Sequence, residues 1–222
     1  MLRSLIYDRL ILRLTTQWYA AVFQRLAPGA TVLDVGVGTA GALLAHERRI
    51  RECGLRVTGI DVDRDYIHRA RARVRAAGLE DQVELALESV YDHAGGPYDA
   101  VYFSGSFMLL PDPERALRHC AGLLSDTGRI YFTQTFQIRR SPLLERLKPW
   151  LRRLTTIDFG QVTYAADFRA HLAHVGLTIE DWTTLDEHRS RAACLVVARP
   201  ARSDAGGQEP RHQHQRRVRN PG

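Results

Sequence analysis

The sequence predicts an α/β protein with a doubly wound, seven-stranded, mostly parallel sheet whose last strand is antiparallel. Along most of the 222 residues, short apolar runs alternate with amphipathic runs of helical period, a pattern typical of a sheet with helices on both faces. The last two expected strands, Leu177–Thr183 and Ala192–Ala198, are separated by too few residues for a helical crossover. We therefore expect these two strands to run antiparallel.

The remaining elements follow from the positions of apolar runs, glycines and capping residues. Strands are predicted at 32–35, 55–60, 82–87, 98–103, 129–135, 177–183 and 192–198. Helices are predicted at 39–53, at 63–77, from Pro113 onward and at 164–175. Gly54 and Gly78 are suited to end helices in the left-handed conformation, and Asp112 is suited to cap the helix that begins at Pro113. The strand 192–198 is apolar throughout, which favours a place inside the sheet.

The chain divides into an N-terminal helical cap at 1–29, the α/β domain at 30–199 and a tail at 200–222. Residues 2–26 have amphipathic helical spacing, as one helix or two, and a helix covering the sheet edge or the site is the favoured interpretation. A membrane-surface helix or a transit peptide is the alternative, and Asp8 argues against the transit peptide. Residues 137–163 form an expected cap insertion, and the basic tail is expected to be disordered.

Composition excludes several classes of protein. The chain is 45% hydrophobic and 25% charged, as in ordinary soluble proteins. About half of the net charge of +6 comes from the tail, where five arginines face two acidic residues. The three cysteines form no C-x-x-C pair, so we expect no disulfide framework and no metal site. No apolar run is long enough to span a membrane. A cytoplasmic location is expected, with peripheral membrane contact through the N-terminal helix or 137–163, or organelle import, left open.

A glycine turn follows the first predicted strand. Gly36, Gly38 and Gly41 have the G-x-G-x-x-G spacing of a nucleotide-binding turn, and a helix-favouring run begins directly afterwards. Asp61 lies twenty residues after Gly41, where a carboxylate can accept hydrogen bonds from ribose hydroxyls. This pattern predicts a nucleotide-like ligand but does not distinguish NAD from other nucleotides.

Asp34 favours a positively charged ligand. It lies two residues before Gly36, where a carboxylate would repel a pyrophosphate and attract an ammonium or sulfonium. The stretch 32–39, together with 59–63 and 98–103, resembles the motifs of the class I S-adenosylmethionine-dependent methyltransferases. The likeness covers residues 30–135 by motif and extends to 199 by layout.

This resemblance implies S-adenosyl-L-methionine as the cofactor and S-adenosyl-L-homocysteine as the product. Asp61 would bind the ribose, Val62 would pack on the adenine, and either Glu88 or Ser89 would contact the adenine amino group. The full set of expected cofactor-binding residues is Asp34, Gly36, Gly38, Thr39, Asp61, Val62, Glu88, Ser89 and Ser104.

The acceptor is expected to be a small molecule, amphiphilic or anionic, methylated by in-line displacement. Because positioning supplies much of the catalysis in such a displacement, no general base is required by the pattern. Candidates for acceptor binding, for which packing is an equally good interpretation at Phe107, are Tyr7, Trp18, Tyr19, Ser106 and Phe107. Weak candidates for a base are His93, Asp158, Tyr164 and His188.

Other functions remain as alternatives. An NAD-dependent oxidoreductase of the short-chain type needs Tyr-x-x-x-Lys, whereas the one lysine, Lys148, follows Leu144 at that spacing. A different use of the cofactor, such as aminopropyl transfer, and an inactive cofactor-binding subunit also fit the fold. Nucleic-acid acceptors are disfavoured because 104–107 lacks the polar-Pro-Pro-aromatic motif of base amino-methylases, and an RNA methyltransferase is a minor alternative. The sequence does not predict the oligomeric state.

Overall fold

The structure is a computed structural model that describes residues 2–137, 164–188 and 191–201, with side chains described from Leu12 onward. Its centre is one seven-stranded sheet with the strand order β3-β2-β1-β4-β5-β7-β6. The strands are β1 (Thr31–Val35), β2 (Arg56–Asp61), β3 (Val83–Leu87), β4 (Tyr98–Ser104), β5 (Leu124–Gln137), β6 (Leu177–His188) and β7 (Arg191–Pro200). β7 pairs antiparallel with both of its neighbours, β5 and β6, whereas the pairs β1–β2, β1–β4, β2–β3 and β4–β5 are parallel. The predicted fold class and the interior position of β7 are confirmed.

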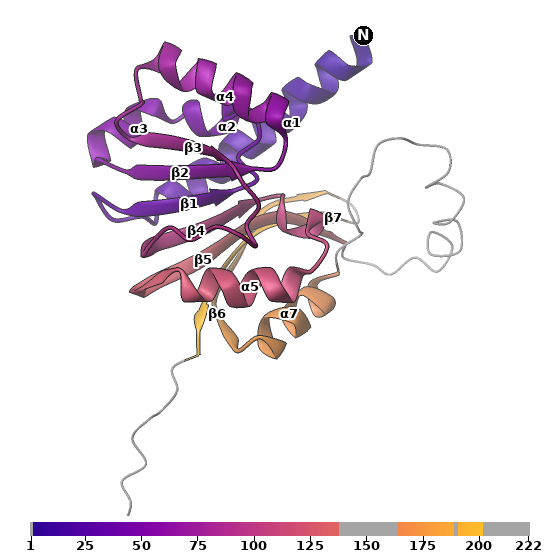
Figure 1. The fold of residues 1–222 in the computed structure, drawn as a ribbon. Coiled ribbons are helices and arrows are strands. Elements are labelled where there is room, and N and C mark those ends of the chain that lie inside the picture. Colours follow the sequence, from indigo (N-terminus) through magenta and orange to yellow (C-terminus); the bar gives the residue numbers. More distant parts are fainter. Residues whose placement is uncertain (1, 138–163, 189–190, 202–222) are drawn as a thin grey trace, which may run out of the picture.

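Helices cover both faces of the sheet (Figure 1). On one face lie α1 (Leu2–Phe23), α2 (Gly41–Leu44), α3 (Glu47–Cys53) and α4 (Arg64–Ala77). On the other lie α5 (Pro113–Gly122) and α7 (Ala165–His174), and a short 3-10 turn, η1 (Phe107–Leu109), follows β4. This double layer buries the apolar side chains of the central strands on both sides, as their sequence requires.

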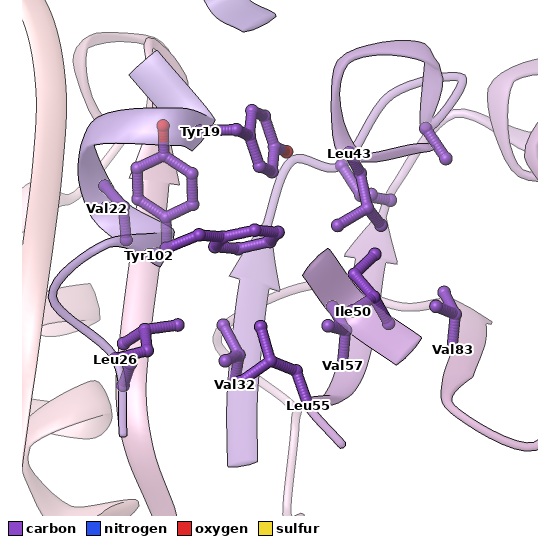
Figure 2. Close-up of a cluster of buried hydrophobic side chains, with 14 of the residues drawn as sticks. Tyr19, Val22, Leu26, Val32, Leu43, Ile50, Leu55, Val57, Val83 and Tyr102 are labelled. Atoms are coloured by element: carbon purple, nitrogen blue, oxygen red, sulfur yellow. The ribbon is translucent and has the colours of Figure 1, made fainter. Parts of the chain in front are cut away.

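The core of the first face includes the C-terminal half of α1. Tyr19, Val22 and Phe23 are at most 3% exposed and pack in the same cluster as Tyr102 of β4. Figure 2 shows Tyr19 and Val22 beside Tyr102, with Leu43 and Ile50 from the following helices in the same cluster. Because α1 contributes fully buried side chains, it is part of the core of the α/β unit.

The second face is an aromatic core. The ring of Phe168 on α7 contacts Phe107, Phe132, Phe136 and Trp182, with ring centroids 5.1–5.9 Å apart. Edge-to-face arrangements dominate these contacts, and such pairs add stability beyond the area that they bury. This core anchors the outer part of the sheet.

Several predicted boundaries were wrong. The helix expected at 39–53 is two helices, α2 and α3, and His46 between them bonds through Nε2 to the carbonyl of Thr16 on α1 (2.8 Å). The strand expected at 129–135 begins earlier, at Leu124, and a register shift against β4 between Tyr98 and Ala100 accommodates the extra residues. β6 continues to His188 and pairs with β7 throughout. In each case, contacts with other elements determine where the helix or strand ends, which the local sequence pattern does not specify.

The helix-end residues predicted from the sequence, Asp112, Gly54 and Gly78, are confirmed, and Asp63 is an additional cap. The side chain of Asp63 accepts hydrogen bonds from the backbone amides of Asp65 and Tyr66 at the start of α4. Asp112 accepts from the amide of Arg115 at the start of α5, and Gly54 and Gly78 end their helices with φ of 60°. These residues fix the helix ends and, with them, the loops at the sheet edges.

Some expectations lie outside the described residues. The cap insertion beyond Gln137, with Asp158, and the tail beyond Ala201 belong to these parts of the chain. The predicted helix at 2–26 is a single helix, α1, but the alternatives of a membrane-surface helix or a transit peptide depend on side chains that precede Leu12. Within the described ranges, no helix combines the length and apolar character needed to cross a membrane.

Candidate cofactor and acceptor site

The turn after β1 is closely packed against the loop after β4. Gly36 has φ of +78°, and a Cβ atom there would lie 2.6 Å from Cβ of Ser106. The Ser106 hydroxyl donates to the carbonyl of Val35, so this side chain ties the two loops together. Glycine is therefore required at position 36 both by backbone conformation and by space. The predicted G-x-G turn lies at the carboxyl edge of the sheet, where ligands bind in such folds.

Asp34 is a buried carboxylate near the end of β1. It is 1% exposed, its Oδ2 atom accepts a hydrogen bond from the hydroxyl of Tyr19 on α1 (2.5 Å), and its Oδ1 atom has no partner among the described residues. The pKa of Asp34 is raised to about 7, mainly by burial and in smaller part by the charge of Asp61, while the Tyr19 hydrogen bond acts in the opposite direction. A buried carboxylate with one free oxygen is suited to bind a cationic group.

Asp61 lies at the end of the neighbouring strand β2 with both oxygens in use. Oδ2 accepts from the backbone amide of Gly38, and Oδ1 accepts from the amide of Asp63, each at 2.9 Å. The carboxylate thereby connects the glycine turn to the end of β2. Since each carboxylate oxygen can accept more than one hydrogen bond, Asp61 can still accept from hydroxyl groups of a ligand.

Thr39 and Arg73 close the other side of the glycine turn. Nη1 of Arg73 on α4 donates to the carbonyl and to Oγ1 of Thr39 (3.1 and 2.7 Å). The guanidinium thus holds Thr39, two residues before α2. The predicted site residues Gly36 and Gly38 are hydrogen-bonded to the end of β2, through the carbonyl of Ile60 and the carboxylate of Asp61.

Two exposed apolar side chains lie beside Asp61. Val62 is 74% exposed, and Leu87, which pairs with Asp61 in the β2–β3 register, is 41% exposed. Exposed aliphatic groups next to a hydrogen-bonding carboxylate are suited to pack against a flat ring. Val62 is a predicted residue, whereas Leu87 was missed because its strand reads as ordinary core.

Glu88 and Ser89, the two candidates for an adenine contact, follow β3 and are both half-buried. The Nδ1 atom of His93 donates to the Glu88 carboxylate (2.8 Å), and the Ser89 hydroxyl accepts from the amide of Tyr91 (3.3 Å). Each side chain therefore has one local partner, and both alternatives remain open.

The residues expected to bind the acceptor divide into two groups. Tyr19 and Trp18 lie on α1 at the site, where the Tyr19 hydroxyl bonds to Asp34 and the Trp18 ring lies against Gly105. Ser106 and Phe107 serve the structure, because Ser106 bonds to β1 and Phe107 is 5% exposed within the aromatic core. The side chain of Tyr7 on α1 lies outside those described.

The weak candidates for a base are dispersed. His93 is 6% exposed, with Nδ1 bonded to Glu88 and Nε2 at 2.8 Å from the Tyr98 hydroxyl, so both ring nitrogens are occupied. This packing disfavours proton abstraction by His93. Tyr164 bridges to Gln137 at the end of β5. His188 ends β6, three strand spacings, or about 14 Å, from β4.

Gln134 on β5 was not predicted as a site residue from its sequence context. Gln134 is 1% exposed, and neither atom of its carboxamide has a hydrogen-bond partner among the described residues. The only signal in the sequence is a glutamine within an otherwise apolar and threonine-rich strand. That signal indicates nothing about burial until the strand is placed.

The arrangement fits a nucleoside ligand that carries a cationic group. Asp34 has a buried oxygen without a partner in the described part of the chain, the glycine turn permits close approach of a ligand to the backbone, and Val62 and Leu87 offer an apolar surface beside Asp61. S-adenosylmethionine combines an ammonium, a sulfonium, a ribose and an adenine, so the donor set matches its chemistry. The buried charge of Asp34 would be compensated by such a cation.

The comparisons with known proteins agree with this geometry. A model of the methyltransferase domain matches residues 33–130. The chain is 32% identical to a ubiquinone biosynthesis O-methyltransferase of Xanthomonas axonopodis pv. citri over 72% of this chain and 68% of that protein. It is 28% identical to a sarcosine/dimethylglycine N-methyltransferase of Halorhodospira halochloris over 81% of this chain and 64% of that protein.

A solved structure shares the fold. The geranyl diphosphate C-methyltransferase of Streptomyces coelicolor A3(2), solved with S-adenosyl-L-homocysteine, geranyl diphosphate and Mg²⁺, superposes with a TM-score of 0.61 at 15% identity. The superposition covers 79% of this chain and 74% of that one. Taken with the sequence matches, these findings show that the chain belongs to the class I S-adenosylmethionine-dependent methyltransferases, with S-adenosylmethionine as its methyl donor.

Proposed function

We propose that the protein transfers a methyl group by in-line displacement to a small amphiphilic acceptor bound at the carboxyl ends of β4 and β5. The names of the proteins above refer to ubiquinone biosynthesis, to sarcosine and dimethylglycine, and to geranyl diphosphate. Because these acceptors differ in charge and in the atom that is methylated, the acceptor of this chain must be argued from its own residues.

The observation that carries the proposal is the free oxygen of Asp34 beside the glycine turn. In this proposal Asp34 binds the ammonium of the cofactor, Asp61 accepts from its ribose, and Val62 and Leu87 pack on its adenine. Bound there, S-adenosylmethionine supplies a methyl group on a sulfonium, which is already a good leaving group. The chain's task is then to orient the acceptor and to exclude water.

The N-terminal segment 1–29 is proposed as a cap over this site. Tyr19 reaches Asp34 from α1, and Trp18 of the same helix lies on Gly105 directly after β4. Leu109 in η1 is 60% exposed on the loop that follows β4 and supports an acceptor with an apolar portion. An acceptor that is apolar in its frame and polar at the reacting end fits these neighbours.

Two measurements test the proposal. Calorimetry with S-adenosylmethionine, S-adenosylhomocysteine and NAD is expected to show binding of the first two only, and binding of NAD alone would contradict the cofactor assignment. Turnover is then followed as S-adenosylhomocysteine release on a panel of phenols, carboxylic acids, amines and lipids. We expect activity on amphiphilic members, whereas activity confined to polar cations would contradict the proposed acceptor class.

A further inference from the structure

Three side chains form a hydrogen-bonded series that runs from the core to the loop after β3. The hydroxyl of Tyr98, at the start of β4, lies 2.8 Å from Nε2 of His93, and Nδ1 of His93 lies 2.8 Å from Oε2 of Glu88. Tyr98 and His93 are each 6% exposed, whereas the side chain of Glu88 is 31% exposed. The series therefore ends at a carboxylate that a ligand can reach.

The two end groups determine which atoms donate along the series. A carboxylate only accepts, so Nδ1 of His93 carries a hydrogen. The pKa of Tyr98 is raised, mainly by burial, so its hydroxyl stays protonated and donates to Nε2 of His93. A neutral imidazole with its hydrogen on Nδ1 satisfies both neighbours.

The imidazole of His93 is fixed from its other sides as well. Nε2 of His119 on α5 donates to the backbone carbonyl of His93 (2.7 Å). The rings of His93 and Tyr98 are stacked, with centroids 5.8 Å apart. A Cβ atom on Gly95 would lie 2.7 Å from Nε2 of His93 and 2.5 Å from the Tyr98 hydroxyl, so the backbone closes over this contact. These contacts direct the Nδ1–H bond of His93 toward Glu88.

Packing alone does not require this series. The two buried polar rings depend on each other and on Glu88 for hydrogen bonds, and apolar rings would fill the same space without that dependence. The histidine and the tyrosine are accounted for if the direction of the Glu88 carboxylate matters to binding.

Glu88 borders the residues proposed to bind the cofactor. Its backbone amide donates to the carbonyl of Asp61 (3.0 Å), and Leu87 before it pairs with Asp61 in the β2–β3 register. Leu87 and Val62 form the exposed apolar surface proposed for the adenine. His93 occupies Oε2 of Glu88, and within the described ranges Oε1 has no hydrogen bond. Glu88 therefore keeps one acceptor oxygen at the edge of this surface.

A carboxylate at this edge distinguishes between bases. The exocyclic amino group of adenine donates hydrogen bonds, which a carboxylate accepts, whereas a carbonyl at the same position of the base would face a second acceptor. Ser89, the alternative residue, has a hydroxyl that both donates and accepts, so it fits either group. A site built to pair with an amino group rejects an analogue that lacks it.

We propose that His93 is a positioning residue that holds the Glu88 carboxylate toward the adenine amino group of the cofactor, with Tyr98 holding His93 from its other ring nitrogen. The proposal rests on the adenine site of the proposed function and adds how the base is selected. It gives His93, predicted as a weak candidate for a base, a role that acts through Glu88.

The test compares two ligands that differ at this position of the base. S-adenosylhomocysteine carries an amino group there, whereas S-inosylhomocysteine carries a carbonyl. Calorimetry with the full chain is expected to show that the wild type binds S-adenosylhomocysteine at least about tenfold more tightly than S-inosylhomocysteine. Glu88→Gln is expected to bring this ratio of affinities to within about threefold of one, since a carboxamide both accepts and donates.

Variants of the two buried rings test the positioning role. His93→Phe keeps a ring but removes the Nδ1–H donor, and it is expected to lower the ratio about threefold. His93→Asn keeps an N–H donor near the position of Nδ1 and is expected to retain more of the ratio than His93→Phe. Tyr98→Phe gives an independent test, with a smaller expected fall because His93 keeps its bond to Glu88.

His46 is the matched control for loss of a structural histidine. It is half-buried, and its Nε2 atom bonds to the carbonyl of Thr16 (2.8 Å). His46→Phe is expected to lower the Tm in thermal unfolding and to leave the ratio unchanged. Because both affinities are measured on one preparation, the ratio does not depend on the fraction of folded chain.

Three results would overturn the proposal: equal affinities of the wild type for the two ligands, a ratio that falls in Ser89→Ala but not in Glu88→Gln, or a wild-type ratio in both His93→Phe and Tyr98→Phe. Failure of the wild type to bind S-adenosylhomocysteine would instead contradict the proposed function itself.

Discussion

Asp34 and Asp61 end adjacent strands and differ in how the fold uses them. Asp61 is half-buried, and both of its oxygens accept hydrogen bonds from backbone amides of the site's own loops. Asp34 is fully buried, has one bond to Tyr19 and keeps one oxygen without a partner among the described residues. Asp61 therefore holds the loops of the site together, whereas the burial of Asp34 in the site destabilises the fold.

The raised pKa of Asp34 determines how its contribution to the free energy of unfolding changes with pH. With burial as the main cause, the folded pKa is about 7, against an ordinary value of 3.8. Between these two values the unfolded chain has released a proton that the folded chain still holds. The contribution of Asp34 to stability is therefore full below about pH 4 and is lost as the pH rises to about 7 and above.

The largest expected effect is that of Asp34→Asn, which should change affinity and stability in opposite directions. Loss of the charge is expected to weaken binding of S-adenosylhomocysteine at pH 8 by at least about thirtyfold, because the ammonium loses its buried partner. The difference in unfolding free energy between variant and wild type should move by about 2 kcal/mol in favour of the variant from pH 5 to pH 8. Calorimetry and urea unfolding at both pH values measure the two quantities.

A variant that binds the cofactor as the wild type does, or whose relative stability is the same at pH 5 and pH 8, would remove the distinction between the two aspartates. Asp99 provides a matched control, because the amide and hydroxyl of Thr31 keep the pKa of its carboxyl below the ordinary value. Asp99→Asn should not gain relative stability as the pH rises.

The next effect is that of Asp61→Ala, in which affinity and stability should fall together. Removal of the carboxylate releases the amides of Gly38 and Asp63, and we expect a loss of about 1–2 kcal/mol in unfolding free energy. Binding of S-adenosylhomocysteine should weaken about tenfold as the glycine turn loses its attachment to β2. Urea unfolding at pH 8 with calorimetry measures both, and a stability equal to that of the wild type would show that the two backbone bonds contribute nothing.

The smallest effect is expected from Tyr19→Phe, which tests the role of the hydrogen bond between Tyr19 and Asp34. The Tyr19 hydroxyl lowers the pKa of Asp34, so its removal should move the pH midpoint of cofactor binding upward, with a loss of affinity of about threefold at pH 7. The aromatic contact with Tyr102 is retained in the variant. Calorimetry from pH 5.5 to pH 8.5 measures the midpoint.

Tyr102→Phe is the control for this shift. Its hydroxyl is also buried but bonds to Thr133 (2.7 Å). An equal displacement of the midpoint in both variants would indicate a general effect of the buried hydroxyls in place of a specific Tyr19–Asp34 bond.

Sequence analysis was sufficient for the sheet, the glycine turn and the two aspartates because these depend on local patterns. The alternation of short apolar runs with amphipathic runs of helical period predicts the strands and helices. The short connection before 192–198 predicts the antiparallel strand. It could not show that Tyr19 bonds to Asp34, since the two residues are brought together by the packing of α1 across the sheet. Nor could it single out Gln134, whose burial depends on β7 and α7 covering β5. Long-range packing therefore decides which polar residues lack partners.

The most direct test of the central claim is the number of protons released when the cofactor product binds. At pH 6 the folded chain holds Asp34 largely protonated, and an ammonium beside its free oxygen requires the carboxylate to ionise. Calorimetric titration of S-adenosylhomocysteine in two buffers of different ionisation enthalpy should give a release of about one proton at pH 6 and close to none at pH 8.5 or in Asp34→Asn. If the wild type releases no proton at pH 6, or if Asp34→Asn still releases one, the assignment of Asp34 as the buried ammonium ligand is contradicted.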